Sequence, residues 1–106
     1  MFEKSNVVDV AGKLEGFYTH LPLGEVDKYS VYISRFKGKY RFHKHHKDEM
    51  YLVMEGEVVI EYAGGQSVSL EANDTLVVQA ETEHRSISDK GALVLMFKSS
   101  GMFAEG

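Results

Sequence analysis

The seven residues from His43 to Glu49 read HKHHKDE and hold three of the chain's five histidines, with a carboxylate at the end. Imidazole nitrogens and carboxylate oxygens are ligands that proteins use for divalent transition metals. The sequence contains no cysteine, so neither a thiolate metal site nor a disulfide framework is available. Any metal that this chain binds must therefore be held by His, Asp, Glu or water.

The local conformation decides which of these side chains can share an ion. In a strand, side chains two residues apart lie on the same face, so His43 and His45 project together while His46 points away. Glu49 can join them only if residues 46–48 turn the chain back, which their polar composition favours.

A helix would make different neighbours: His45 and Glu49 four residues apart, or His46 and Glu49 three residues apart. The residues that follow, MYLVMEGEVVIEY, contain a glycine and many β-branched and aromatic residues, which favours strand. A third interpretation is a surface loop whose histidines merely cluster. Spacing alone leaves both the metal site and this loop open.

The chain that must position these residues is predicted to be a series of short strands. Hydrophobic and β-branched runs alternate with turns rich in glycine, asparagine and aspartate. The predicted strands are residues 29–36, 50–54, 57–62, 67–70, 75–78, 84–88 and 92–98, with breaks at 37–38 and 89–91. This pattern, with one proline and no long helical period, is typical of an all-β sandwich or barrel.

The N-terminal part of the chain carries the only helix signal. Ser5 and Asn6 could cap a short helix that ends at about Leu14. Residues 16–28 are expected to be irregular or to form one further strand. A chain of 106 residues suits one domain, in which residues 1–28 pack as an N-terminal segment on a barrel of residues 29–106.

Composition restricts the partners and the compartment. The formal charge of −4 argues against a nucleic-acid-binding protein, although residues 37–47 are locally basic. The sequence shows neither a secretory signal nor an apolar run long enough to span a membrane. We therefore expect a cytoplasmic protein whose partner is a small molecule, with no nucleic-acid or membrane partner.

Three predicted strands are apolar on both faces, which bears on assembly. The runs 50–54, 76–78 and 93–97 carry hydrophobic residues at odd and even positions, as in strands that are covered on both sides. A second copy of the chain would supply the outer cover, so we expect a homodimer. The alternative is that the N-terminal segment and Met102–Phe103 cover this face within one chain.

The histidine run resembles the first motif of the cupin superfamily. That motif is a glycine, five residues, His-x-His, three or four residues, a glutamate, six residues and a glycine. Here Gly38 is followed by only four residues before the first histidine. From His43 through His45 and Glu49 to Gly56 the spacing matches throughout.

The segment NDTLVVQAETEHRSIS, residues 73–88, fits the register of the second cupin motif without a gap. That motif is a glycine, five residues, a proline, one residue, a glycine, two residues, a histidine, three residues and an asparagine. Only the histidine, His84, is kept. The departures are Asn73 and Glu81 for the glycines, Gln79 for the proline and Ser88 for the asparagine. Asparagine tolerates a left-handed backbone, whereas the other loop changes put the placement of the histidine in question.

The resemblance covers about residues 36–97 and implies a cupin-type jelly-roll β-barrel, also called a double-stranded β-helix. Segments such as DEMYLVMEGEVVIEY and TEHRS are similar to those of small single-domain, RmlC-like cupins, some of them named for likeness to mannose-6-phosphate isomerase. The family would make four residues the ligands of one divalent transition metal, Mn, Fe, Co, Ni, Cu or Zn. These are His43, His45, Glu49 and His84.

The same resemblance implies that two of these histidines come from one strand, the glutamate from the next, and His84 from a strand much later in the chain. His46 is then interpreted as a turn residue. His20 is interpreted as a surface or locally hydrogen-bonded histidine and not as a ligand.

Three functions are compatible with such a barrel. The first is a metal-dependent enzyme, oxygenase-like or isomerase/lyase-like, that acts on a small polar molecule. The second is a module that binds or senses a metal and a small ligand without turnover, and the third is a metal-free barrel with a degraded second motif. The catalytic acid or base is not identified. Arg41 could meet an anionic substrate, Tyr51 could line the cavity, and Glu81 and Glu83 flank the last ligand, but each also suits a surface or core position.

Overall fold

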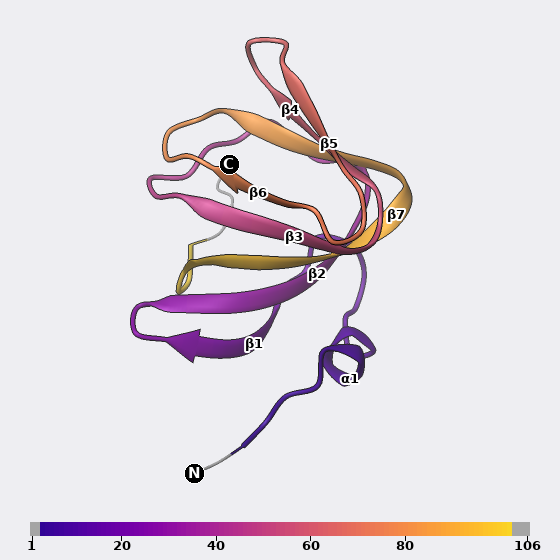
Figure 1. Ribbon diagram of the computed structural model, residues 1–106, viewed down its shortest axis with the longest axis vertical. Helices are drawn as coiled ribbons and strands as arrows, with labels where there is room; N and C mark the ends of the chain where they lie inside the picture. Colours follow the sequence, from indigo (N-terminus) through magenta and orange to yellow (C-terminus); the bar gives the residue numbers. More distant parts are fainter. Residues whose placement is uncertain (1–2, 103–106) are drawn as a thin grey trace.

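The structure is a computed structural model that describes residues 3–102. One short helix and seven strands follow one another along these residues (Figure 1). They are α1 (Val7–Ala11), β1 (Leu21–Val26), β2 (Tyr29–Lys39), β3 (Glu49–Gly56), β4 (Val58–Tyr62), β5 (Ser67–Leu70), β6 (Thr75–Val78) and β7 (His84–Ser99). The predicted all-β class with one short N-terminal helix is confirmed, and the segment that could have been irregular contains β1.

The N-cap of helix α1 is Asn6, one of the two predicted caps, whose side-chain Oδ1 accepts a hydrogen bond of 3.1 Å from the backbone N–H of Asp9. The helix ends at Ala11, so the predicted end at Leu14 is wrong. Gly12 follows directly, and glycine has a low helix propensity. The short helix therefore contributes only a few hydrophobic side chains to the surface of the sheet.

The last strand, β7, is the central strand of the structure. Its second half lies between β2 and β3, and its first half pairs with β4. Figure 1 shows β7 curving from one layer of strands to the other. The predicted break at residues 89–91 is wrong, because these residues form a bulge within one continuous strand. Likewise β2 continues through the predicted break at 37–38 to Lys39.

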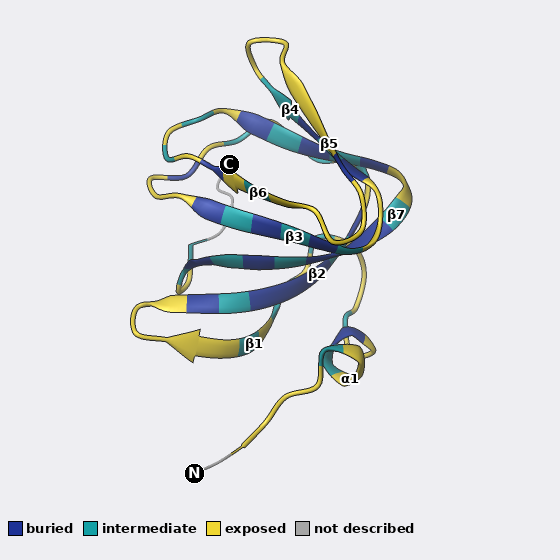
Figure 2. Cartoon of the chain, viewed as in Figure 1, coloured by how far each residue is buried: buried dark blue, intermediate teal, exposed yellow. Residues whose placement is uncertain are grey.

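Side chains of the central strands alternate between two hydrophobic clusters, which appear as alternating dark blue and teal segments along β3 and β7 in Figure 2. The interior cluster is Tyr32, Phe36, Tyr51, Val53, Val58, Ile60, Leu70, Val78, Ala92, Val94 and Met96. The outer cluster joins Ala11 of α1 to Ile33 of β2 and Leu93 of β7. Part of the outer face is thus covered by the N-terminal segment. Of the predicted C-terminal cover, Met102 is half-buried and Phe103 lies outside the described residues.

A glycine is required at the end of β3. Gly56 has a φ of +82°, and a Cβ at this position would overlap the carbonyl oxygen of Gly91 and lie 3.0 Å from the Cα of Ala92. The left-handed backbone and this close approach both exclude a side chain. The turn from β3 into β4 therefore depends on this glycine.

We expect Gly56→Ala to lower the free energy of unfolding by about 3 kcal/mol, because it adds backbone strain to a steric clash. Gly64→Ala is the control, since a Cβ there meets no atom within 4 Å. That variant should change stability by less than about 0.5 kcal/mol. Urea unfolding followed by circular dichroism measures both, and equal midpoints for the two variants would contradict the expected role of Gly56.

Candidate metal centre

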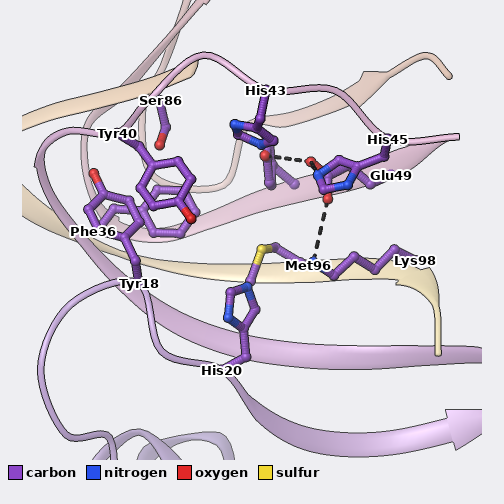
Figure 3. A pocket seen from close by; sticks show the side chains of 11 residues that line it. Tyr18, His20, Phe36, Tyr40, His43, His45, Glu49, Ser86, Met96 and Lys98 are labelled. Carbon is purple, nitrogen blue, oxygen red and sulfur yellow. Dashed lines mark hydrogen bonds and ion pairs between the residues drawn. The ribbon is translucent and has the colours of Figure 1, made fainter. Parts of the chain in front are cut away.

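The structure brings all four predicted ligand residues into one group. Their ligand atoms lie within 4.8 Å of one another, and they are His43, His45, Glu49 and His84. The two histidines that are close in sequence lie in the connection between β2 and β3, while Glu49 begins β3 and His84 begins β7. Figure 3 shows three of the four, with the rings of His43 and His45 and the Glu49 carboxylate close to one another.

Backbone hydrogen bonds hold the connection that carries the histidines. His43 and His84 form an isolated antiparallel bridge, in which each backbone N–H donates to the other's carbonyl oxygen at 2.9 Å. The carbonyl oxygen of His45 accepts a hydrogen bond of 2.7 Å from the N–H of Glu81. The expectation that His43 and His45 lie in a regular strand is therefore wrong, although their side chains do reach the same group.

The unusual residues of the second motif keep its backbone shape. Asn73 and Glu81, which replace the two motif glycines, have φ values of +77° and +63°. Both residues therefore adopt the left-handed conformation that glycine would adopt. The Glu81 carboxylate also accepts a hydrogen bond of 2.7 Å from Nδ1 of His46, and Ser88 Oγ donates to the carbonyl oxygen of Glu57 at 2.7 Å. These departures do not prevent His84 from reaching the other three residues.

Two of the histidine rings have a defined tautomer. Nδ1 of His43 lies 2.9 Å from the carbonyl oxygen of Arg41, and Nδ1 of His84 lies 2.8 Å from that of Thr82. A carbonyl oxygen only accepts hydrogen bonds, so Nδ1 of each ring carries a proton and Nε2 is the nitrogen that could bind a metal. Burial lowers the pKa of His43 to about 4, so this ring is neutral at pH 7. Histidines that bind metals are commonly oriented in this way.

Nε2 of His84 is a buried nitrogen without a hydrogen-bond partner. It lies 3.4 Å from Oε1 of Glu49, and Nε2 of His45 lies 3.7 Å from the same oxygen. A buried ring nitrogen without a hydrogen-bond partner is costly, and an ion bound by both this nitrogen and the carboxylate would remove that cost. The arrangement therefore fits a divalent ion bound by three imidazoles and one carboxylate.

The Glu49 carboxylate has two further neighbours besides the histidines. The hydroxyl of Tyr51 donates to its Oε1 at 2.6 Å, and Nζ of Lys98 lies 3.7 Å from its Oε2. Burial alone would raise the pKa of Glu49, but the nearby Lys98 ammonium and the Tyr51 hydroxyl stabilise the ionised carboxylate and hold its pKa below the usual range. The carboxylate is therefore ionised at neutral pH, while burial raises the pKa of Tyr51 and keeps its proton in place.

Three of the four residues, His43, His45 and Glu49, form one wall of a cavity of about 30 Å³ that opens to the surface. This volume holds an ion or two to three waters, because one water requires roughly 10–15 Å³ by this measure. The opposite wall is aromatic: the ring of Tyr18 lies 5.0 Å from that of Phe36 and 4.6 Å from that of Tyr40 (Figure 3). The cavity therefore combines three of the candidate metal ligands with an aromatic wall.

The structure also places the other residues that the sequence singled out. His20, expected at the surface or in a local hydrogen bond, is half-buried and lines the cavity, and burial lowers its pKa to about 4. Arg41 does not line the cavity, because its guanidinium lies over the ring of Tyr40 at 4.9 Å from the centroid. The side chain of His46 is 90% exposed and Glu83 is exposed, so both lie outside the cavity.

Sequence reasoning missed Lys98, which lines the cavity as a buried cation. A signal for it exists in the sequence, since Lys98 shares the inward register of Val94 and Met96 in the apolar run LVLMFK. A lysine in the inward register of an apolar strand is unusual unless it is paired. Tyr18 and Ser86 also line the cavity and carried no recognisable signal.

Comparisons with known proteins agree with this geometry. Residues 36–97 match the family model described as Cupin domain. The uncharacterized protein YdbB of Bacillus subtilis (strain 168) is 30% identical over 89 residues, which is 83% of this chain and 79% of YdbB.

Two solved structures are also similar. A cupin-2 domain containing protein from Shewanella frigidimarina has a TM-score of 0.85 and 21% identity, over 90% of this chain and 93% of that one. Hydroquinone 1,2-dioxygenase PnpCD, in complex with Cd²⁺ and 4-hydroxybenzonitrile, has a TM-score of 0.79 and 23% identity, over 92% of this chain and 72% of that one. At these identities the likeness shows the fold, so the predicted jelly-roll barrel is confirmed. Among residues 3–102, no helix is long and apolar enough to cross a membrane.

The pair of Lys98 and Glu49 generates a prediction about stability. In metal-free protein we expect Lys98→Met to lower the free energy of unfolding by about 3–5 kcal/mol, because it leaves a buried carboxylate without its cation. Lys39→Met removes an exposed lysine from β2 and should change stability by less than about 0.5 kcal/mol. Denaturant unfolding in the presence of a chelator measures both. A loss below about 1 kcal/mol for Lys98→Met would show that other groups compensate the charge of Glu49.

Proposed function

Because the chain belongs to the cupin domain family, we propose that it is a small metal-dependent enzyme with a mononuclear site. The residues that would hold one divalent transition metal ion are His43, His45, Glu49 and His84. When bound, such an ion supplies a Lewis acid, or a position for oxygen, in contact with a small polar substrate.

The observation that carries this proposal is the buried, unpartnered Nε2 of His84, 3.4 Å from the carboxylate of Glu49. A divalent ion bound by this nitrogen and this oxygen together would account for a buried polar atom that has no hydrogen-bond partner. The backbone hydrogen bonds of Nδ1 in His43 and His84 support the same interpretation, since they leave Nε2 of both rings as the nitrogen available to a metal.

The protein's own residues would prepare the site for chemistry. Tyr51 orients Glu49 through its 2.6 Å hydrogen bond and holds a proton at the edge of the cavity. Tyr18, Phe36 and Tyr40 exclude water from the opposite side. We favour an oxygenase-like reaction, because a similar fold occurs in a hydroquinone dioxygenase solved with Cd²⁺; an isomerase- or lyase-like reaction is the alternative.

We expect untagged protein to bind one divalent ion per chain, measured by plasma mass spectrometry after purification and after loading with Mn, Fe, Co, Ni, Cu or Zn. An ion at one hundred to one thousand times its dissociation constant should stabilise the fold by about 3–4 kcal/mol, which a chelator reverses. His84→Gln should lose most of both effects. His46→Ala, which removes an exposed histidine from the same connection, should keep them.

The outcomes separate the three functions. An ion together with turnover of a small polar substrate, lost in His84→Gln and kept in His46→Ala, supports the enzyme. An ion without turnover of any substrate in a broad panel would favour a binding or sensing module. If the protein takes up no ion under any loading condition, the metal-free barrel is the remaining interpretation.

We also propose that the chain forms a homodimer through an apolar stripe on the outer face of the sheet. The stripe consists of Val31, Phe97, Met50 and Val77, which pair in this order across β2, β7, β3 and β6. Helix α1 packs elsewhere on this face, and Val77 remains 50% exposed. A symmetric interface needs a self-complementary surface, and an uncharged apolar stripe meets that need with a second copy of itself.

We expect light scattering after size-exclusion chromatography to give the mass of two chains. Val77→Lys should shift the protein toward one chain, because it places a charge at the edge of the stripe. Val8→Lys is the matched control, since Val8 is 77% exposed on α1 and outside the stripe. A wild-type mass of one chain at micromolar concentration would argue against the dimer.

A further inference from the structure

Lys98 occupies an unusual position for a lysine. Its side chain is only 2% exposed, yet it lines the cavity that contains the metal-ligating group. It is the direct cross-strand partner of Glu49 in the pairing of β7 with β3, and its Nζ lies 5.6 Å from the ring centroid of Tyr32. Figure 3 shows the side chain reaching along the cavity floor toward Met96, with His20 on the far side.

The charges of the cavity lining do not balance once a divalent ion is present. Among the described residues that line the cavity, Glu49 is the only carboxylate and Lys98 the only lysine or arginine. The one negative charge of Glu49 offsets the lysine, so the two charges of the ion remain uncompensated in a buried site. Uncompensated charge is costly at low dielectric, and an anionic ligand removes that cost.

We propose that the ligand of this site is a small carboxylate, with Lys98 as the residue that selects its negative charge. This inference rests on the proposed function, because the ion is the other group that the carboxylate contacts. Arg41, the cation that the sequence suggested for this role, lies outside the cavity. Beside an ion, the small cavity has room for little more than the carboxylate oxygens of the ligand, and the aromatic wall of Tyr18, Phe36 and Tyr40 suits a short apolar body that extends toward the opening.

The test uses Co²⁺-loaded protein, whose visible absorption reports both the bound ion and changes in its coordination. Acetate is titrated as the carboxylate and acetamide as its neutral counterpart. We expect acetate to bind at least about tenfold more tightly to the wild type than to Lys98→Met, because hydrogen bonds to charged groups are strong. Lys39→Met, which changes an exposed lysine on β2, should bind acetate as the wild type does.

A second measurement on the wild type covers the case in which Lys98→Met does not fold. In Zn²⁺-loaded protein with isotopically labelled lysine, the ε-methylene NMR signals of Lys98 should shift as acetate saturates the site. The signals of Lys39 and the other exposed lysines should stay in place, and acetamide should shift none of them.

Failure of this inference differs from failure of the proposed function. If the protein binds no Co²⁺, the proposed metal site is wrong, and the proposal of a carboxylate ligand fails with it. If the protein binds one Co²⁺ but binds acetate equally well in the wild type and in Lys98→Met, or binds no acetate, the carboxylate proposal is wrong while the metal site stands. The absence of acetate binding would mean that a metal-bound hydroxide balances the charge.

Discussion

A carboxylate buried inside a barrel is the constraint on which the rest of this structure depends. Glu49 is 2% exposed, and an ionised group at such depth must be surrounded by partners. The sheet supplies them from three directions: Lys98 across the pairing of β3 with β7, Tyr51 two residues along the same strand, and the imidazoles of the β2–β3 connection and the start of β7.

The departures in the second motif show what that part of the chain is needed for. The loop before His84 needs a backbone shape, and glycine is one way to obtain it. Asn73 and Glu81 reach the same left-handed conformation at a cost of about 1–2 kcal/mol each. Glu81 offsets part of that cost, because its N–H donates a hydrogen bond to the carbonyl oxygen of His45 and its carboxylate accepts one from the ring of His46. A motif can thus lose its characteristic residues and keep its geometry.

Sequence patterns predicted the features of the fold that depend on neighbouring residues in the chain. The strands at 67–70 and 75–78 have the predicted bounds, because turn residues flank them on both sides. The side chains of His43 and His45 reach the same group, as their spacing predicted, although they lie outside a regular strand. The sequence could not show that 89–91 form a bulge, since a turn and a bulge use the same residues. The positions of Lys98, which was overlooked, and of His20 in the cavity could not be predicted for a different reason: only the pairing of distant strands decides which buried positions face one cavity.

The place of β7 in the sheet has a consequence for how the protein is made. This strand comes last in the chain among the described elements, yet it pairs with β2, β3 and β4 and contributes His84 to the four-residue group. The edges of β2, β3 and β4 that pair with β7 therefore stay unpaired until β7 has been synthesised. Before that point only local pairings such as the hairpin of β4 and β5 can form, so the barrel closes in a late step of folding.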